Sequence, residues 1–313
     1  MATLIGLQLA PSFASANPHY QNLTAEERIL WDQHGIDAPS LDLLPGAEAR
    51  RRGETTTLNV VIVLVDFEDV PADVVAHPPA YYEDLFFSRD THPTGSVADY
   101  FHKVSHGRFE LTGIVKGWYR APRTSDYYTA NRGGLGFFPT NAQGLAIDAV
   151  QLVNPDINLA HYDNEGPDLI PDSGDDDENV DGFIIIHAGD GREGGSISAD
   201  NFTAVKWNTV KPVPADGVFV SPFTLNPETG NIGIYIHEIG HLLGLPDLYP
   251  TLSSIQGSSF GMGQWSVMAG GFNLEGGVYP CDFDAWSKAQ LGFVDVVRVF
   301  SNRDDEVIPP VSE

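Results

Sequence analysis

The chain has 313 residues, of which 42% are hydrophobic, so it is long enough to bury one large core or the cores of two smaller lobes. Seventeen basic residues stand against forty-three acidic ones, and the formal charge of -26 disfavours nucleic acid and anionic membrane surfaces as partners. The single cysteine, Cys281, excludes an intramolecular disulfide, and no run approaches the roughly 18 apolar residues of a membrane span.

Residues 1–55 form the first predicted segment. Its short apolar stretch at the start resembles at most a trimmed signal peptide, because no basic region precedes it. We expect a short helix over Thr24–His34, begun by a capping box in which Glu27 is the partner of Thr24. The cluster Arg50–Arg52 is predicted to be exposed, and it is either a processing site or a solvated loop. The whole segment is either the tail of a propeptide or a strap across the domain that follows.

A catalytic domain is predicted over residues 56–300, followed by a tail or linker at 301–313. Leu58–Phe67 is a continuous β-branched run, which indicates a strand buried on both faces. The other elements that we expect are, in chain order, a helix over Ser96–Ser105, one or two strands over Phe109–Tyr119, a helix over Asn141–Val153, a strand over Gly182–Ala188 and a helix that ends at Gly244. This order predicts an α/β (α+β) fold with a twisted mixed sheet, covering helices above a cleft, and a smaller lobe after Gly244.

Carboxylates crowd residues 163–181, directly before one of the predicted strands. Asp177, Asn179 and Asp181 fall at alternate positions before a glycine, as the first ligands of an EF-hand-type calcium loop do. The loop is not an EF-hand, because Ala188 replaces the glutamate expected at its twelfth position. We predict a calcium site here rather than a plain acidic surface loop, and the candidate ligands are Asp163, Asp168, Asp175, Asp177, Asn179 and Asp181. His187, at the end of the following strand, is interpreted as a structural histidine.

The strongest functional signal is the sequence His237-Glu238-Ile239-Gly240-His241, which lies in an apolar run. Residues four apart share one face of a helix, so His237 and His241 can bind one metal ion. Two imidazoles suit zinc, which takes three protein ligands and a water in catalytic sites. Glu238 is placed to reach that water as a general base. The alternative is an amphipathic helix whose two histidines are four apart by chance.

A third zinc ligand is expected shortly after this helix. Gly244 can end the helix in the left-handed conformation, and Pro246 prevents its continuation. A chain that reverses there can bring Asp247 back to the metal, although an aspartate at such a place is also a common turn residue. Asp282 or Asp284, farther along the chain, remains a rival third ligand.

Three segments together resemble known peptidases. The pattern H-E-x-x-H-x-x-G-x-x-D resembles the zinc signature of the metzincins, with aspartate in place of the usual third histidine. The sequence W-S-V-M-A-G-G at 265–271 resembles their Met-turn, with Met268 as its methionine, although a buried methionine is often only a gap-filling residue. The segments D-A-W-S-K-A-Q-L-G at 284–292 and V-A-D-Y-F-H-K-V-S-H-G-R-F-E-L-T-G at 97–113 resemble the immune inhibitor A family of secreted bacterial metallopeptidases.

The resemblance implies a metzincin-like, two-lobed catalytic domain with a Met-turn in the smaller C-terminal lobe. It implies a secreted zinc endopeptidase that acts on proteins or peptides, in which His237, His241 and Asp247 hold zinc and Glu238 is the general base. Calcium is expected as a second metal, and a monomer is favoured. Many metzincins carry a tyrosine two residues after the Met-turn methionine; that position is Gly270 here, so Tyr249 and Tyr279 are candidate substitutes.

A rival from another functional class is a calcium-stabilised binding or adhesion module with a vestigial peptidase site. The retained Glu238 counts against this reading, because an inactive site can lose its general base most freely.

Overall fold

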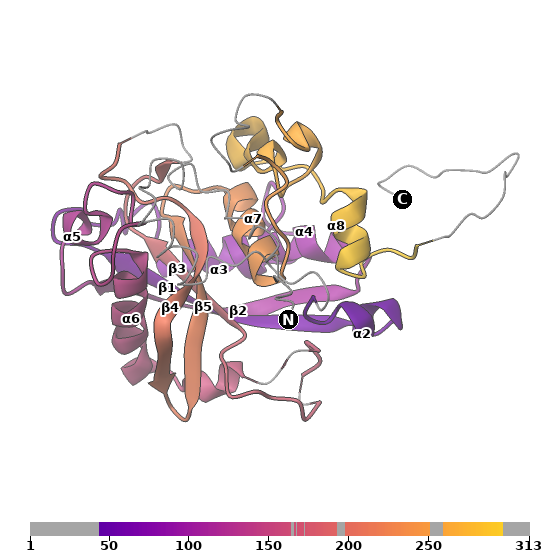
Figure 1. The fold of residues 1–313 in the computed structure, drawn as a ribbon, viewed down its shortest axis with the longest axis horizontal. Coiled ribbons are helices and arrows are strands. Elements are labelled where there is room, and N and C mark those ends of the chain that lie inside the picture. The colour runs from indigo at the N-terminus through magenta and orange to yellow at the C-terminus, as the bar shows by residue number, and fades with distance from the viewer. Residues whose placement is uncertain are drawn as a thin grey trace, which may run out of the picture.

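The centre of the fold is a five-stranded mixed sheet (Figure 1). A computed structural model of the chain describes residues 44–163, 166, 168–171, 173–192, 198–250 and 259–296. The strands lie in the order β2-β1-β3-β5-β4, and β4 alone is antiparallel to its neighbour. Their bounds are β1 (Thr56–Asp66), β2 (Phe109–Arg120), β3 (Gly182–His187), β4 (Val205–Ala215) and β5 (Val218–Pro227). The predicted α/β class with a mixed sheet is therefore confirmed.

Helices cover both faces of the sheet, and all the named elements after β5 are helical. The α-helices are α2 (Ala47–Arg51), α3 (Pro79–Phe87), α4 (Val97–Val104), α5 (Ser125–Thr129), α6 (Ala142–Val153), α7 (Ile232–Leu242) and α8 (Ala285–Gln290). The 3-10 helices are η2 (Asn154–Asp156), η3 (Leu159–Tyr162), η5 (Gly263–Trp265) and η6 (Gly270–Gly277). None of the helices in these described ranges is both long and apolar enough to cross a bilayer.

Strand β1 separates two hydrophobic clusters, because its side chains alternate between the two faces of the sheet. Val60, Ile62 and Leu64 join a cluster that includes residues of α3, α4 and α7, whereas Val61 and Val63 join one built around α6. All five side chains are 0% exposed, as the apolar run of the sequence predicts for a strand buried on both faces. The helix that carries the histidine motif therefore packs against the first of these two clusters.

Several elements form where their local sequence signals lie. Ser96 begins α4 with a capping box, in which its hydroxyl accepts from the Asp99 backbone and the Asp99 side chain accepts from the Ser96 backbone. The predicted helix at Asn141–Val153 is α6, with Asn141 as its capping residue. The predicted strands at Phe109–Tyr119 and Gly182–Ala188 are β2 and β3. The β4–β5 hairpin and helix α3 have no counterpart among the predicted elements.

The N-terminal part of the described chain contradicts one expectation. The cluster Arg50–Arg52 was predicted to be exposed, and Arg51 and Arg52 are, but Arg50 is 0% exposed and lies in α2. Composition misleads here because one acceptor of the guanidinium is the carbonyl of Leu291, 241 residues away, which a local reading of the sequence does not reveal. The predicted helix Thr24–His34 and the tail 301–313 lie outside the described residues.

Candidate metal centre

Helix α7 ends at a tight reversal that positions the residues after it. Gly244 has φ +95°, a conformation that favours glycine over residues with a side chain. The Gly244 amide donates to the carbonyl of His241 and the Leu245 amide donates to that of Gly240, at 3.1 and 3.0 Å. These two bonds form the Schellman pattern of a glycine-terminated helix, so the predicted stop at Gly244 is confirmed.

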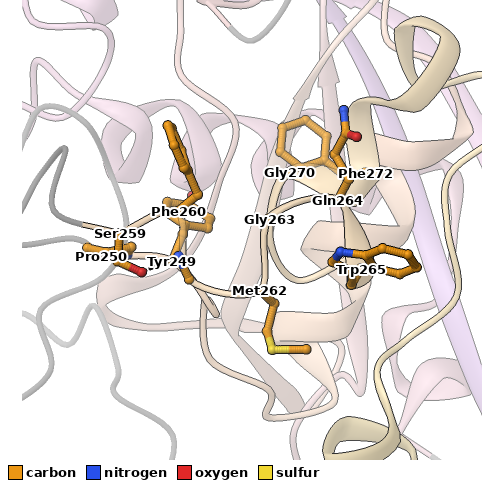
Figure 2. A pocket seen from close by; sticks show the side chains of 11 residues that line it. Tyr249, Pro250, Ser259, Phe260, Met262, Gly263, Gln264, Trp265, Gly270 and Phe272 are labelled. Atoms are coloured by element: carbon orange, nitrogen blue, oxygen red, sulfur yellow. Dashed lines mark hydrogen bonds between the residues drawn. The ribbon is translucent and has the colours of Figure 1, made fainter.

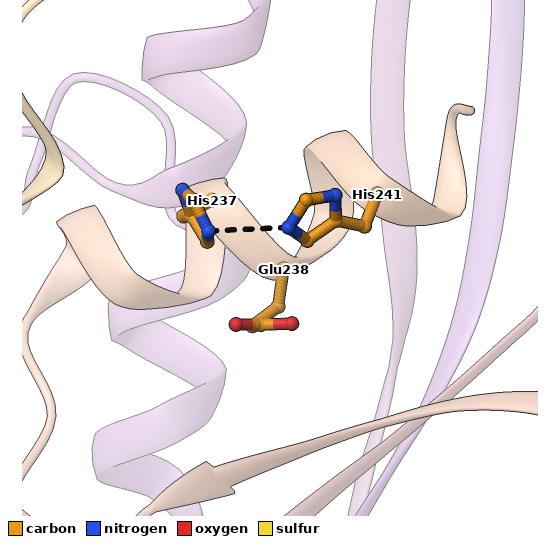
Figure 3. Close-up of side chains that lie close together, drawn as sticks. All are labelled: His237, Glu238 and His241. Atoms are coloured by element: carbon orange, nitrogen blue, oxygen red, sulfur yellow. Dashed lines mark hydrogen bonds between the residues drawn. The ribbon is translucent and has the colours of Figure 1, made fainter. Parts of the chain in front are cut away.

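Both histidines of the motif are oriented by backbone carbonyls. His237 Nδ1 lies 2.8 Å from the Val267 carbonyl oxygen, and His241 Nδ1 lies 2.7 Å from that of Leu245. A carbonyl oxygen only accepts, so each Nδ1 carries a hydrogen and each Nε2 is the nitrogen left to bind a metal. The two Nε2 atoms face one another at 3.2 Å (Figure 3). This arrangement lets the two Nε2 atoms share one cation.

The side chain of Asp247 lies beside the Nε2 atoms of both histidines. Its Oδ1 lies 3.2 Å from His237 Nε2 and 3.4 Å from His241 Nε2, and its side chain is 8% exposed. Nitrogen and oxygen ligands of a tetrahedral zinc ion lie about 3.3 Å from one another, since each is about 2.0–2.2 Å from the metal. The three atoms therefore have the mutual spacing that zinc requires.

The electrostatics of Asp247 favour its charged form. Burial by itself raises the pKa of this carboxyl, but attraction to His241 and hydrogen bonding with His237 outweigh burial and hold the pKa well below its usual range. The site thus offers a buried carboxylate beside two imidazole lone pairs, a donor set that suits zinc.

Glu238 lies beside this cluster and is 3% exposed. One of its carboxylate oxygens lies within 4.8 Å of a ring nitrogen of each histidine. Figure 3 shows its carboxylate projecting beside the imidazole pair rather than between the two rings. The distances favour Asp247 as the third ligand and leave Glu238 within reach of a group bound at the centre.

The W-S-V-M segment packs directly beneath α7. Met268 is 0% exposed, and a Cβ added at Gly240 would lie only 2.5 Å from its sulfur. The neighbouring Val267 supplies the carbonyl that binds His237. The glycine at position 240 thus lets the methionine approach the histidine helix closely.

The two rival carboxylates are engaged elsewhere. Asp284 accepts four hydrogen bonds, two from backbone amides at the start of α8 and two from the hydroxyls of Ser266 and Ser287. Asp282 pairs with Lys288 at 2.8 Å. Asp284 therefore caps a helix and ties Ser266, the residue before Val267, to that helix.

A large pocket lies next to the histidines. Its volume is about 870 Å³, and its lining includes Phe260, Met262, Trp265 and Phe272 (Figure 2). The centre of the Phe272 ring lies 5.1 Å from that of the His237 ring. Phe260 and Trp265 are strongly exposed, at 84% and 83%. Of the two tyrosine candidates, Tyr249 lines this pocket and Tyr279 is exposed.

The candidate calcium ligands do not form a comparable centre. Among the loop residues that the structure describes, no three such side chains bring ligand atoms within 4.8 Å of one another. In the acidic loop, Asp168 and Asp175 both accept from the Ser173 hydroxyl, and Asp177 accepts from the amide of Asn179.

Asp163 and Asp181 flank this loop. Burial and the nearby charges of Asp177 and Asp176 raise the pKa of the Asp163 carboxyl. The Asp181 amide donates to the Tyr162 carbonyl directly before β3. His187, at the end of β3, is 1% exposed, and its Nδ1 lies 2.9 Å from the Ala188 carbonyl oxygen.

The groups that orient His237 and His241 were not predicted from the sequence. The Val267 and Leu245 carbonyls carry no sequence signal, because any residue supplies a carbonyl. The bond between Ser266 and Asp284 joins residues 18 apart, although Asp284 followed by Ser287 has the pattern of a helix cap.

Comparisons with known proteins show which family this chain resembles. Residues 46–293 match the family described as immune inhibitor A peptidase M6, catalytic domain. The chain is 31% identical over 278 residues to the pre-pro-metalloprotease PrtV of Vibrio cholerae serotype O1, an alignment that covers 76% of this chain and 30% of the relative. It is 27% identical over 265 residues to immune inhibitor A of Bacillus thuringiensis subsp. alesti, covering 72% of this chain and 38% of the relative.

The chain spans about a third of the length of these relatives, so the similarity concerns one part of each. The family match, in contrast, covers most of the present chain and includes the histidine motif, Asp247 and Met268. The chain therefore belongs to the immune inhibitor A family of metallopeptidases, peptidase M6, and holds its catalytic domain.

Proposed function

We propose that this protein is a zinc-dependent endopeptidase with His237, His241 and Asp247 as metal ligands. The observation that carries the proposal is the convergence of their three ligand atoms at 3.2 to 3.4 Å, beside the buried Glu238. When bound, zinc acidifies a water and polarises the carbonyl of the scissile bond.

The chain's own residues supply the remaining chemistry. The carbonyls of Val267 and Leu245 keep the two Nδ1–H groups fixed, so that both Nε2 lone pairs stay directed at the metal position. The Glu238 carboxylate takes the proton of the attacking water and delivers it to the departing amine. Its burial keeps it near the reacting atoms and limits competition from bulk water.

We assign the centre to the metzincin type, with Met268 as the Met-turn methionine in a smaller C-terminal lobe. The support for this is the packing of its sulfur against Gly240 of the histidine helix. A methionine there packs against the helix as a compact apolar residue. Its neighbour Val267 orients His237, the first proposed ligand.

Proteins or peptides are the substrate class that we propose. The apolar pocket beside Phe272 has room for side chains of a bound peptide, and aromatic residues at its rim give it an apolar character. We further propose that the protein is secreted, in keeping with its resemblance to a family of secreted peptidases, and that it acts as a monomer.

Calcium is proposed as a second, structural metal in the acidic loop. The raised pKa of Asp163 supports this, because a cation there would compensate the repulsion between Asp163 and its neighbours. Calcium added to the zinc-loaded protein should raise Tm, and the increase should be smaller for Asp175→Asn. A Tm that does not respond to calcium would remove this proposal.

The test of the main proposal is casein hydrolysis by the zinc-loaded protein and by Glu238→Gln. We expect the parent to cleave casein and the variant to lose at least about 99% of the rate, because a general base contributes roughly 10²–10⁴-fold. Glu83→Gln, at an exposed position of α3, is the matched control and should keep the parental rate.

Equal activity of the parent and Glu238→Gln would contradict the role of Glu238. A zinc-loaded parent that binds casein without cleaving it would instead favour a binding module with a vestigial peptidase site.

A further inference from the structure

The segment before β1 is held in place by a buried arginine. Residues Leu44–Arg51, here called the strap, include α2 and its N-terminal turn. Arg50 donates from Nε to the Leu291 carbonyl, from Nη1 to the Thr56 hydroxyl and from Nη2 to the Pro45 carbonyl, at 2.5, 2.6 and 2.7 Å. One side chain thus joins the strap, the start of β1 and the end of α8.

The surroundings of Arg50 make this attachment firm. Its guanidinium lies 5.6 Å from the centre of the Phe109 ring and 5.4 Å from that of Phe293. Burial, and then the charge of Arg51, lower its pKa to about 9. Releasing any of its three acceptors would leave polar groups buried without their partner, so the guanidinium and the strap stay together.

The strap also reaches the reversal after the histidine helix. A Cβ added at Gly244 would lie 2.5 Å from Leu44 Cδ2 and 3.7 Å from Pro45 Cδ. Leu44 is 7% exposed and belongs to the same hydrophobic cluster as Leu245. The strap therefore covers the turn at Gly244 (Figure 1 shows α2 at the same end of the molecule as α8).

This turn controls two of the three proposed ligands. The Leu245 carbonyl orients His241, and Asp247 follows two residues later. A displacement of the turn would move the carbonyl and the carboxylate together. Outer-shell groups that orient a ligand typically change metal affinity by about 10–100-fold when they are lost.

We propose that Leu44 and Arg50 are positioning residues of the metal centre, which act through the Gly244 turn on His241 and Asp247. The inference rests on the proposed zinc site and adds the strap to it. The strap is then a working part of the peptidase domain, and a maturation cut that removed it would weaken metal binding.

The first test compares the zinc affinities of Leu44→Ala and of Leu135→Ala in the full chain. Leu135 is 2% exposed but belongs to the cluster on the opposite face of the sheet, so it controls for the loss of a buried leucine. Affinity is measured by competition with a chelator, at a temperature where circular dichroism shows every variant to be folded. We expect Leu44→Ala to bind zinc about tenfold more weakly and Leu135→Ala to match the parent.

Equal affinities in Leu44→Ala and the parent would overturn the proposal. Leu44→Met is expected to restore the affinity, because methionine fills a similar volume over the turn. A loss that Leu44→Met does not repair would also count against positioning by packing.

A second test examines Arg50 and the ligand geometry. Arg50→Lys keeps the charge but cannot make three bonds with a fixed fork, so we expect it to weaken zinc binding as Leu44→Ala does. In the cobalt-substituted protein, both variants should alter the visible absorption spectrum, which reports coordination, while Leu135→Ala should not. Unchanged spectra in both strap variants would contradict the proposal.

Asp247→Ala separates failure of this inference from failure of the proposed function. If the parent binds zinc and Asp247→Ala does not weaken it, the proposed ligand set is wrong. If Asp247→Ala weakens zinc binding but the strap variants do not, the ligand set stands and the strap has no positioning role. An active form that begins at Gly53 with full zinc affinity would likewise refute the role of the strap.

Discussion

Two regions of this molecule concentrate potential metal ligands, and they differ in how those ligands are supported. The proposed metal centre combines Asp247 with two histidines, and the carbonyls of Val267 and Leu245 accept from the histidine Nδ1 atoms. The loop at 163–181 has many more carboxylates, but Asp168 and Asp175 share the Ser173 hydroxyl instead of meeting at one point. Hydrogen bonds that orient the side chains, more than the number of potential ligands, therefore bring ligand atoms together.

Close packing around the metal centre predicts the largest effect. A Cβ at Gly233 would lie 1.9 Å from the Phe272 carbonyl oxygen, so Gly233→Ala should displace η6 and destabilise the fold by about 3 kcal/mol. Gly174, in the acidic loop, has φ +94° and no atom within 4 Å of its added Cβ, so Gly174→Ala should cost only about 1 kcal/mol. Urea unfolding of both variants measures the difference, and equal losses would contradict it.

Acid should also distinguish the buried histidine at the end of β3 from the acidic loop. Burial lowers the pKa of His187 to about 4, against an ordinary value of 6.5, so the folded state binds this proton less readily than the unfolded chain. Stability from His187 is therefore complete above about pH 6.5 and is lost as the pH falls to about 4, by on the order of 3 kcal/mol. Asp163 has a raised pKa, so its protonation at low pH relieves repulsion in the acidic loop.

Unfolding of the parent and of His187→Asn between pH 4 and pH 7 measures this contribution. We expect a shallower pH dependence in the variant. Parallel curves would show that His187 does not titrate as its burial implies.

A matched pair of substitutions compares the two regions directly. Asp247→Asn removes the carboxylate that faces both histidines, and we expect zinc affinity to fall about 100-fold. Asp163→Asn should leave zinc affinity unchanged and slightly raise stability without calcium, because it removes a charge that burial and Asp177 disfavour. Chelator competition and thermal unfolding provide the two readouts, and a similar zinc response in both variants would erase the distinction.

Substitution of Asp284, which supports the proposed metal centre through Ser266, should have a smaller effect on stability. Asp284→Asn has a single acceptor oxygen, so it cannot accept from both the two hydroxyls at Oδ2 and the two amides at Oδ1, and we expect a loss of about 2 kcal/mol and a looser turn at Ser266. Zinc affinity should fall as well, because the looser turn would displace the Val267 carbonyl that orients His237. Asp282→Asn, which loses only the pair with Lys288, serves as the control.

Local signals in the sequence predicted the elements that depend on local physics. The apolar run of β1 and the helix expected over Ser96–Ser105 lie where the structure has them. Gly244 was expected to end α7, and it does so with a positive φ. These features depend on residues within one or two turns of each other, which is why a reading of the sequence recovers them.

Non-local contacts explain what could not be predicted. Arg50 was expected to be exposed, but its partner Leu291 lies 241 residues away. The carbonyls that orient His237 and His241 belong to the backbone, so residue identity gives no sign of them. Asp247 was a candidate ligand from its spacing alone, and only the folded chain gives its distance to the histidines.

X-ray absorption at the zinc edge of the zinc-loaded protein tests the central claim most directly. We predict one zinc ion bound by two imidazole nitrogens and at least one carboxylate oxygen at about 2.0–2.2 Å. In Asp247→Ala, the carboxylate contribution should be lost. A zinc environment made only of oxygen ligands, or one that Asp247→Ala leaves unchanged, would contradict the site built from His237, His241 and Asp247.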